Sequence, residues 1–257
     1  MFADVYLTGT VQKLYEPTNG IVYAKVKTVK TIQTKDGPIS SYANVLLKQK
    51  EGYEQYVGKL EPNDLIFTRG YLEVDEHGNP ALNNKGEPMF ILVPWVVRIL
   101  GETVSESIND EFSVVALGYM GKDPEMRYMS DGDTVVTNIN LATSRGYTVN
   151  GQNNKETTWW RIAFWRKLAE NVNAYTHKGS RLLVVGSVNY DEKTHAPRSF
   201  TRKDGTIGSS FEVTGSNFKF TDSKGESNGG YHEMGVNPDN NFDNSIPESE
   251  EDSDIPL

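Results

Sequence analysis

The sequence contains no cysteine, and this absence removes several classes of protein. Disulfide scaffolds, thiolate zinc sites and cysteine nucleophiles are excluded, and a chain without thiols fits a reducing cytoplasm. No apolar run approaches the roughly 20 residues that span a bilayer, so we expect no membrane segment. The first residues, Met1–Asp4, lack the basic and apolar regions of a signal peptide, so we expect none.

Motifs of catalysis are missing as well. The chain has no Walker A sequence, no GxGxxG, no HExxH and no Gly-x-Ser-x-Gly. The four histidines are scattered, and none pairs at metal-ligand spacing: His77, His177, His195 and His232. We therefore expect a protein that is not an enzyme and that uses no cofactor and no metal.

An excess of positive charge is also absent, because the formal net charge is −9. The charge is unevenly placed, however. Residues 225–257 carry nine acids and no Lys or Arg, so residues 1–224 are neutral as a whole. Within residues 145–203 there are 11 bases and four acids, a local charge of +7. The total therefore conceals a basic stretch and an acidic end.

The acidic end is rich in Gly, Asn and Ser and poor in apolar residues. Such a segment cannot bury enough surface to offset the entropy of ordering it, so we expect residues 224–257 to be disordered. It closes with Asp254-Ile255-Pro256-Leu257, an apolar tip after an acidic run. Composition alone leaves two interpretations open, a solubilising tail or an interaction tail.

The rest of the chain reads as short β-branched and aromatic runs broken by turn residues. The predicted strands are Val5–Val11, Ile21–Ile32, Ser40–Lys48, Leu65–Val74, Met89–Leu100, Ser113–Gly118, Val135–Ser144, Thr157–Trp165, Leu182–Tyr190 and Ser209–Thr221. Short helices are predicted at Gly52–Leu60 and Lys167–His177. Both halves thus have three strands, a short helix and two strands.

This repeated order predicts a duplicated unit of about 110 residues. Gly9 and Gly118 are 109 positions apart, and Gly70 and Gly186 are 116 apart. Five strands with a helix before the fourth is the layout of the OB-fold, a small Greek-key barrel that binds oligonucleotides or oligosaccharides. We therefore predict an all-β fold with two tandem OB-folds and an acidic tail. The predicted domains are residues 1–105, 110–223 and 224–257.

The most informative segment is Thr157–Trp165. Alternate residues of a strand share a face. One face holds only apolar residues and is predicted to be core: Trp160, Ile162 and Phe164. The other face holds Trp159, Arg161 and Trp165, and an Arg between two Trp would be costly to bury unpaired. Exposed Trp beside Arg is typical of single-stranded nucleic-acid binding, although a Trp-rich packing seam or oligomer interface is the alternative.

Two further elements add aromatic and basic residues. Tyr147 follows Arg145 in a predicted hairpin, and Phe200 lies in a predicted loop tip with Arg202 and Lys203. Each is an ordinary loop residue when taken singly. Together they place aromatics and bases at three points around one predicted barrel.

Several stretches of the second half have a distinctive sequence, namely Ala116–Tyr128, Asn138–Ser144, Thr158–Arg161, Lys167–Glu170 and Lys178–Ser180, together with the acidic tail and its Asp-Ile-Pro-Leu end. By these stretches, residues 113–222 resemble the bacterial single-stranded DNA-binding proteins. The resemblance implies that bases stack on Tyr147, Trp159, Trp165 and Phe200, and that Arg161, Lys167 and Lys178 lie near the path of the strand. The hairpin and loop aromatics are usually Trp in the family, and the last residue is usually Phe where this chain has Leu257.

The first half is more diverged. Aligning Tyr42 with Trp159 places Asn44 against Arg161 and Lys48 against Trp165, so one aromatic is kept. The second strand of this half instead presents Tyr23, Lys25 and Lys27 on one face. This half either binds the DNA backbone more electrostatically, with Tyr42 as an additional contact, or it is mainly structural.

The resemblance implies a cytoplasmic, nucleoid-associated protein that coats single-stranded DNA in replication, recombination and repair. Asp252, Asp254, Ile255, Pro256 and Leu257 would bind DNA-processing proteins. The family works with four OB-folds, so two per chain imply a homodimer. The alternatives are an OB-fold assembly module of the primosome type and an RNA-binding chaperone.

Overall fold

The computed structural model of the protein describes residues 1–16, 20–50, 54–102, 109–130, 132–149, 151–201 and 207–221. Some of the predicted features lie outside these residues. They are the acidic tail with its tip, and the basic pair Arg202 and Lys203. Among the described residues, no helix is long and apolar enough to cross a membrane.

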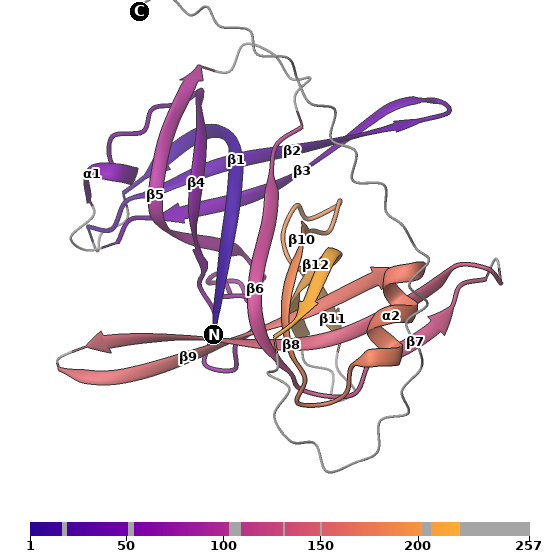
Figure 1. Ribbon diagram of the computed structural model, residues 1–257. Coiled ribbons are helices and arrows are strands. Elements are labelled where there is room, and N and C mark those ends of the chain that lie inside the picture. The colour runs from indigo at the N-terminus through magenta and orange to yellow at the C-terminus, as the bar shows by residue number, and fades with distance from the viewer. Residues whose placement is uncertain are drawn as a thin grey trace, which may run out of the picture. The chain divides into compact units, whose positions relative to one another are not determined.

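The first half contains five strands and one short helix (Figure 1). Their bounds are β1 Phe2–Tyr15, β2 Tyr23–Thr34, β3 Gly37–Lys48, α1 Glu54–Val57, β4 Asp64–Leu72 and β5 Phe90–Glu102. Apolar and polar side chains alternate along these strands, so that Ala24 and Val26 are fully buried while Lys25 and Lys27 face outward. The predicted order of elements in this half is confirmed.

Pairing closes these strands into a barrel. The sequence of neighbours is β1, β2, β3, β5, β4 and back to β1. Only the β3–β5 pair is parallel. This is the closure of a five-stranded Greek-key barrel, and it agrees with the predicted OB-type fold.

The second half repeats this closure as β6, β8, β9, β12, β10 and back to β6, with β9 and β12 parallel. The bounds are β6 Phe112–Met120, β7 Glu125–Tyr128, β8 Val135–Val149, β9 Gln152–Trp165, α2 Lys167–Tyr175, β10 Arg181–Asn189, β11 Arg198–Thr201 and β12 Ile207–Phe220. The sequence analysis did not predict β7 and β11. It also ended β8 five residues early, because polar residues continue the β8–β9 hairpin beyond the barrel.

Two pairs of glycines occupy equivalent places in the two barrels. A Cβ on Gly9 would lie 2.6 Å from the Lys27 carbonyl oxygen, and one on Gly118 would lie 2.3 Å from that of Ala142. Gly70 and Gly186 each pair beside a bulge in the neighbouring strand. The glycine spacings in the sequence therefore have a structural cause, since both barrels need the same close approaches of strands.

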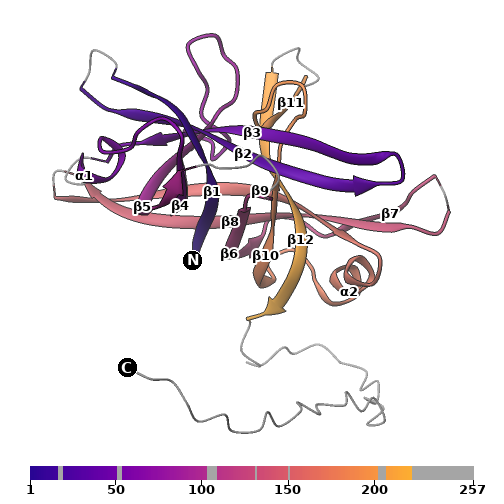
Figure 2. The same ribbon diagram turned by 90° about the horizontal axis from the view of Figure 1, so that it is seen from above.

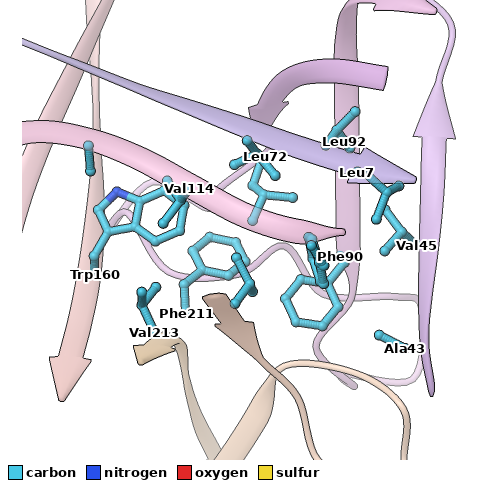
Figure 3. Close-up of a cluster of buried hydrophobic side chains, with 14 of the residues drawn as sticks. Leu7, Ala43, Val45, Leu72, Phe90, Leu92, Val114, Trp160, Phe211 and Val213 are labelled. Carbon is cyan, nitrogen blue, oxygen red and sulfur yellow. The ribbon is translucent and has the colours of Figure 1, made fainter. Parts of the chain in front are cut away.

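The two barrels share a sheet and a core. Strands β1 and β6 pair antiparallel, from Phe2 opposite Leu117 to Leu7 opposite Phe112. The ring of Phe90 lies 5.1 Å from that of Phe112 and 6.1 Å from that of Phe211, so β5 packs against β6 and β12 (Figure 3). Both barrels belong to one compact unit that ends at Asp222. The predicted bounds between the two domains stay a prediction.

Candidate nucleic-acid interface

Strand β9 has one buried and one exposed face, as its sequence predicts. Trp160, Ile162 and Phe164 are 1% exposed or less. Trp159 and Trp165 are 38% and 39% exposed, and Arg161 between them is also exposed. The Trp160 indole N–H donates a hydrogen bond of 3.0 Å to Thr143 Oγ1, which satisfies the only polar atom of this buried ring.

Neighbouring strands extend the exposed face with polar residues. On β8, Asn140 lies opposite Arg161 of β9 and Asn138 lies opposite Ala163 of β9. On the far side of β8, Arg127 of β7 lies in the same cross-strand row as Trp165. Arg127 was missed as a site residue because the short strand that carries it was not predicted, although it belongs to the stretch that resembles the family.

Acidic side chains already partner some of the bases on this face. Glu212 of β12 lies 3.9 Å from Arg161 Nη1 and 3.7 Å from Arg198 Nε. A hydrogen bond and charge from Lys122, and then the charge of Arg161, lower the pKa of Glu125. The two ion pairs of Glu212 are long, and the side chains of Arg161 and Arg198 are exposed, so a phosphate group can compete for the same guanidinium groups.

The ring of Trp159 is held by backbone on two sides. The Trp159 amide donates a 3.0 Å hydrogen bond to the carbonyl oxygen of Gly78, in the loop between β4 and β5 of the first barrel. Gly78 has φ +81°, and a Cβ there would lie 2.3 Å from the Thr157 carbonyl oxygen and 2.9 Å from Trp159 Cδ1. A Cβ on Gly121 would lie 2.7 Å from Trp159 Cζ3. One glycine from each half therefore fixes the position of this ring.

Tyr147 and Trp159 are brought to the same cavity. This open cavity of about 500 Å³ is bordered on its other side by residues 74–77 of the first half. Tyr147 is 40% exposed, and the Arg145 guanidinium lies 5.0 Å from its ring centroid. The two predicted stacking residues thus flank one space that is open to solvent.

The remaining predicted residues of the second half lie around this barrel. Phe200 is 47% exposed on β11, where it pairs with Gly208 of β12. Lys167 opens α2 and forms an exposed ion pair of 3.0 Å with Glu170. Lys178 lies in the turn before β10, where its amide donates a hydrogen bond to Asp123. The structure does not gather Phe200, Lys167 and Lys178 into one contact cluster with Trp159.

In the first barrel, Tyr42 is engaged by the second half. Its ring stacks on His195 with centroids 3.7 Å apart, and Lys27 Nζ lies 4.8 Å from its centroid. His195 Nδ1 donates to the Tyr42 carbonyl oxygen at 2.9 Å, and the Asn44 amide donates to the His195 carbonyl oxygen at 2.8 Å. Lys25 and Asn44 line a cavity of about 610 Å³ next to His195.

The alignment of Tyr42 with Trp159 is wrong by two residues. Lys27 and Ala142 are equivalent, because Gly9 and Gly118 approach their carbonyl oxygens in the same way. Lys27 pairs with Asn44, and Ala142 pairs with Trp159, so Asn44 takes the place of Trp159. Val45 and Trp160 then pair equivalently with Phe90 and Phe211. Aromatic identity misled the sequence alignment, whereas the hydrogen-bonded register decides it.

The corrected register changes what the first barrel presents. The places of Trp159, Arg161 and Trp165 are held by Asn44, Leu46 and Lys50. Tyr23, Lys25 and Lys27 correspond to Asn138, Asn140 and Ala142 of β8. At the positions of Trp159, Arg161 and Trp165 the first barrel therefore has no aromatic residue. It has Tyr23 in place of Asn138, and three lysines, Lys25, Lys27 and Lys50, where the second barrel has none. Among the described residues of both barrels, no group of three or more His, Asp or Glu is placed to hold a metal ion.

Comparison with known proteins gives a consistent family. The model of the single-strand binding protein family matches residues 112–221. A single-stranded DNA-binding protein of Oceanobacillus iheyensis is 33% identical over 125 residues, which cover 47% of this chain and 72% of that protein. One of Neisseria meningitidis is 32% identical over 118 residues, or 46% of this chain and 63% of its own length. The chain thus spans less than two thirds of the Neisseria relative.

Solved structures extend the likeness to both barrels. The wild-type single-stranded DNA binding protein of Thermus aquaticus superposes with a TM-score of 0.57 over 89% of this chain and 97% of that chain, at 21% identity. A deletion mutant of the same protein gives a TM-score of 0.58 at 19% identity, over 89% and 98%. At these identities the likeness shows the fold.

Proposed function

The chain belongs to the single-strand binding protein family, and from this premise we propose that it binds single-stranded DNA. It coats exposed strands in the cytoplasm, without strong sequence preference, during replication, recombination and repair. Its role is binding and not catalysis. The observation that carries the proposal is the pair of exposed rings, Trp159 and Trp165, on either side of Arg161 on one face of β9.

On this face, aromatic residues stack on bases and basic residues neutralise phosphates. Every base has a π face, so stacking on an aromatic ring is worth about 1–3 kcal/mol whatever the sequence. We assign Trp159, Trp165, Tyr147 and Phe200 to stacking. We assign Arg161, Lys167 and Lys178 to phosphates, with Arg202 and Lys203 beyond the described residues. In the first barrel, Tyr23, Lys25 and Lys27 contact the backbone, and Tyr42 borders them.

A fluorescence titration with oligo-dT of increasing length, at two salt concentrations, tests the proposal. Tryptophan emission is expected to fall on binding, and the log–log slope of affinity against salt is expected to be about −0.7 per neutralised phosphate. Unquenched emission would overturn the proposal. Competition with RNA of equal length separates this function from RNA binding.

We propose that the chain forms a homodimer through an apolar outer face of the shared sheet. Val115 and Leu117 of β6 lie beside Val185 and Leu183 of β10, and Phe2 of β1 lies beside Leu117. Phe2 and Val185 are 41% and 36% exposed. A row of apolar side chains across adjacent strands fits a second copy of the same surface. Sedimentation should give a dimer, and Leu183→Asp with Val185→Asp should give a folded monomer; an unchanged dimer would exclude this face.

The C-terminal tip is proposed to recruit proteins that process DNA, through Asp252, Asp254 and the apolar residues Ile255, Pro256 and Leu257. Acids beside a short apolar end suit a basic-rimmed apolar pocket on a partner. Deleting Asp254–Leu257 should spare oligo-dT binding and abolish capture of replication and repair proteins. Unchanged capture would rule out this role for the tip.

A further inference from the structure

Trp95 is an exposed tryptophan outside the β8–β9 face. It lies on β5 at a bulge, because Arg69 pairs with Val96 while Gly70 pairs with Pro94. A bulge re-aims a side chain, and the Trp95 ring is 39% exposed. The second barrel has the same bulge beside Gly186, and Ser216 occupies it. The bulge itself therefore does not require an aromatic residue.

A chain of ring and cation contacts links Trp95 to Tyr147. The rings of Trp95 and Tyr71 lie 5.2 Å apart. The Arg145 guanidinium lies 3.7 Å from the Tyr71 ring and 5.0 Å from the Tyr147 ring. Seen from above in Figure 2, the long β8–β9 hairpin, which carries Arg145, extends toward the same side of the molecule as α1, β4 and β5. The contacts thus continue from a proposed stacking residue of the second barrel onto the first barrel.

A cavity of about 170 Å³ opens between these groups. Trp95, Tyr71 and Arg145 line it together with Phe2, Ser144 and Thr158. An apolar cavity of about 150 Å³ holds one benzene ring, so this one is large enough for a single six-membered aromatic ring. Its lining offers aromatic rings, a guanidinium group and hydroxyl groups. That is the mixture of stacking surface and hydrogen-bond donors that an unpaired pyrimidine base uses.

The surroundings favour DNA over another occupant. Arg145 forms a 2.7 Å ion pair with Glu156 and is about three quarters buried, so its guanidinium plane is held in place. Lys50 Nζ lies 5.3 Å from the Trp95 ring and adds positive charge at the outer edge. Burial raises the pKa of Tyr71, and the nearby Arg145 opposes this effect, so the tyrosine stays a neutral stacking surface.

We propose that this cavity takes one base of the same DNA strand that stacks on Tyr147, so that the strand passes from the second barrel onto the first over Arg145. The proposal rests on the proposed function and names a route for the strand that the β8–β9 face does not contain. Longer DNA would engage Trp95, and shorter DNA would saturate Trp159 and Trp165 without reaching it.

Reporter variants isolate the emission of Trp95. In the double variant Trp159→Phe, Trp165→Phe, the remaining tryptophans are Trp95 and the buried Trp160. Adding Trp95→Ser, which imports the side chain of the second barrel's bulge, leaves the Trp160 background to be subtracted. In the unaltered protein, quenching by oligo-dT should stop increasing above a certain oligonucleotide length. Oligo-dT should quench the Trp95 emission only when it is longer than that. In the otherwise unaltered chain, Trp95→Ser should lower the affinity for long oligo-dT about tenfold, which is the contribution of one stacked base. The affinity for short oligo-dT should stay unchanged.

Each outcome decides the matter. If oligo-dT quenches the unaltered protein but not Trp95 at any length, the cavity is not on the path, and the proposed function stands. If the unaltered protein is not quenched either, the proposed function itself fails. If Trp95 emission responds to protein concentration without DNA and not to oligo-dT, the cavity is covered by a second copy, which also overturns the proposal.

Discussion

The two barrels share a frame and differ in what they display on it. Each has a glycine where its first two strands cross closely, a bulge in its last strand and a parallel pair that closes the barrel. On the equivalent strands β3 and β9, however, the first barrel presents Asn44 and Leu46 where the second presents Trp159 and Arg161. The frame therefore does not determine the ligand, and a few outward side chains do.

The two barrels also differ in the contacts that a loop of each makes with the other barrel. The Trp159 amide bonds to the Gly78 carbonyl of the first barrel, and the equivalent Asn44 amide bonds to the His195 carbonyl of the second. A loop carbonyl of each barrel thus accepts a hydrogen bond from the equivalent strand residue of the other barrel, Trp159 or Asn44. At one position the result is a positioned, exposed Trp ring. At the other it is a polar residue beside a stacked Tyr–His pair.

Removing both exposed rings of the second barrel should have the largest effect. Trp159→Ala with Trp165→Ala loses two stacking surfaces, so affinity for oligo-dT should fall by roughly 30-fold or more at 1–3 kcal/mol per base. Anisotropy of a labelled oligonucleotide measures this without tryptophan emission. The matched variant at the equivalent position of the first barrel, Asn44→Ala, should change affinity less than threefold by the same rule. Equal losses from the two barrels would remove the distinction between them.

Gly78→Ala tests whether the first barrel positions the ring of the second. The added methyl group would meet the Thr157 carbonyl and the Trp159 ring at positive φ, so the loop must shift. We expect affinity to fall by about the value of one stacked base, tenfold, and the free energy of unfolding to fall by about 2 kcal/mol. Gly86→Ala is the control, because Gly86 has φ +79° with nothing within 4 Å of a Cβ. Similar affinities for both variants would show that only backbone strain matters.

The sequence predicted the order of strands and the two faces of β9, because alternation and turn residues are local. It did not show that Asn44 occupies the position equivalent to Trp159, because the register of a strand depends on hydrogen bonds to strands that are distant in the sequence. Arg127 was missed because β7 has only four residues, all exposed. The involvement of Gly78 and His195 was not predictable either, since each acts on the other barrel.

Charge on the first barrel is the next test. If Lys25 and Lys27 contact phosphates, the variant Lys25→Gln, Lys27→Gln should reduce the magnitude of the log–log salt slope by about 1.4. Its charge-matched control replaces Lys35 and Lys59 by Gln, two exposed lysines that are not cross-strand partners of Lys25 or Lys27. The slopes come from anisotropy titrations at several salt concentrations. A slope equal to that of the control would leave the first barrel with a structural role.

Glu212→Gln should have the smallest effect, and in the opposite direction. The carboxylate lies within 4 Å of Arg161 and Arg198, so it holds two guanidinium groups that a phosphate would otherwise contact. Exposed pairs of this kind are worth about 0–1 kcal/mol each, so affinity for oligo-dT should rise about two- to fivefold. The equivalent place in the first barrel is Ile91, which has no charge to remove. Glu61→Gln, at an exposed acid of the first half, controls for net charge. If the two variants gain equally, the effect comes from net charge alone, whereas a gain confined to Glu212→Gln locates phosphate binding at Arg161 and Arg198.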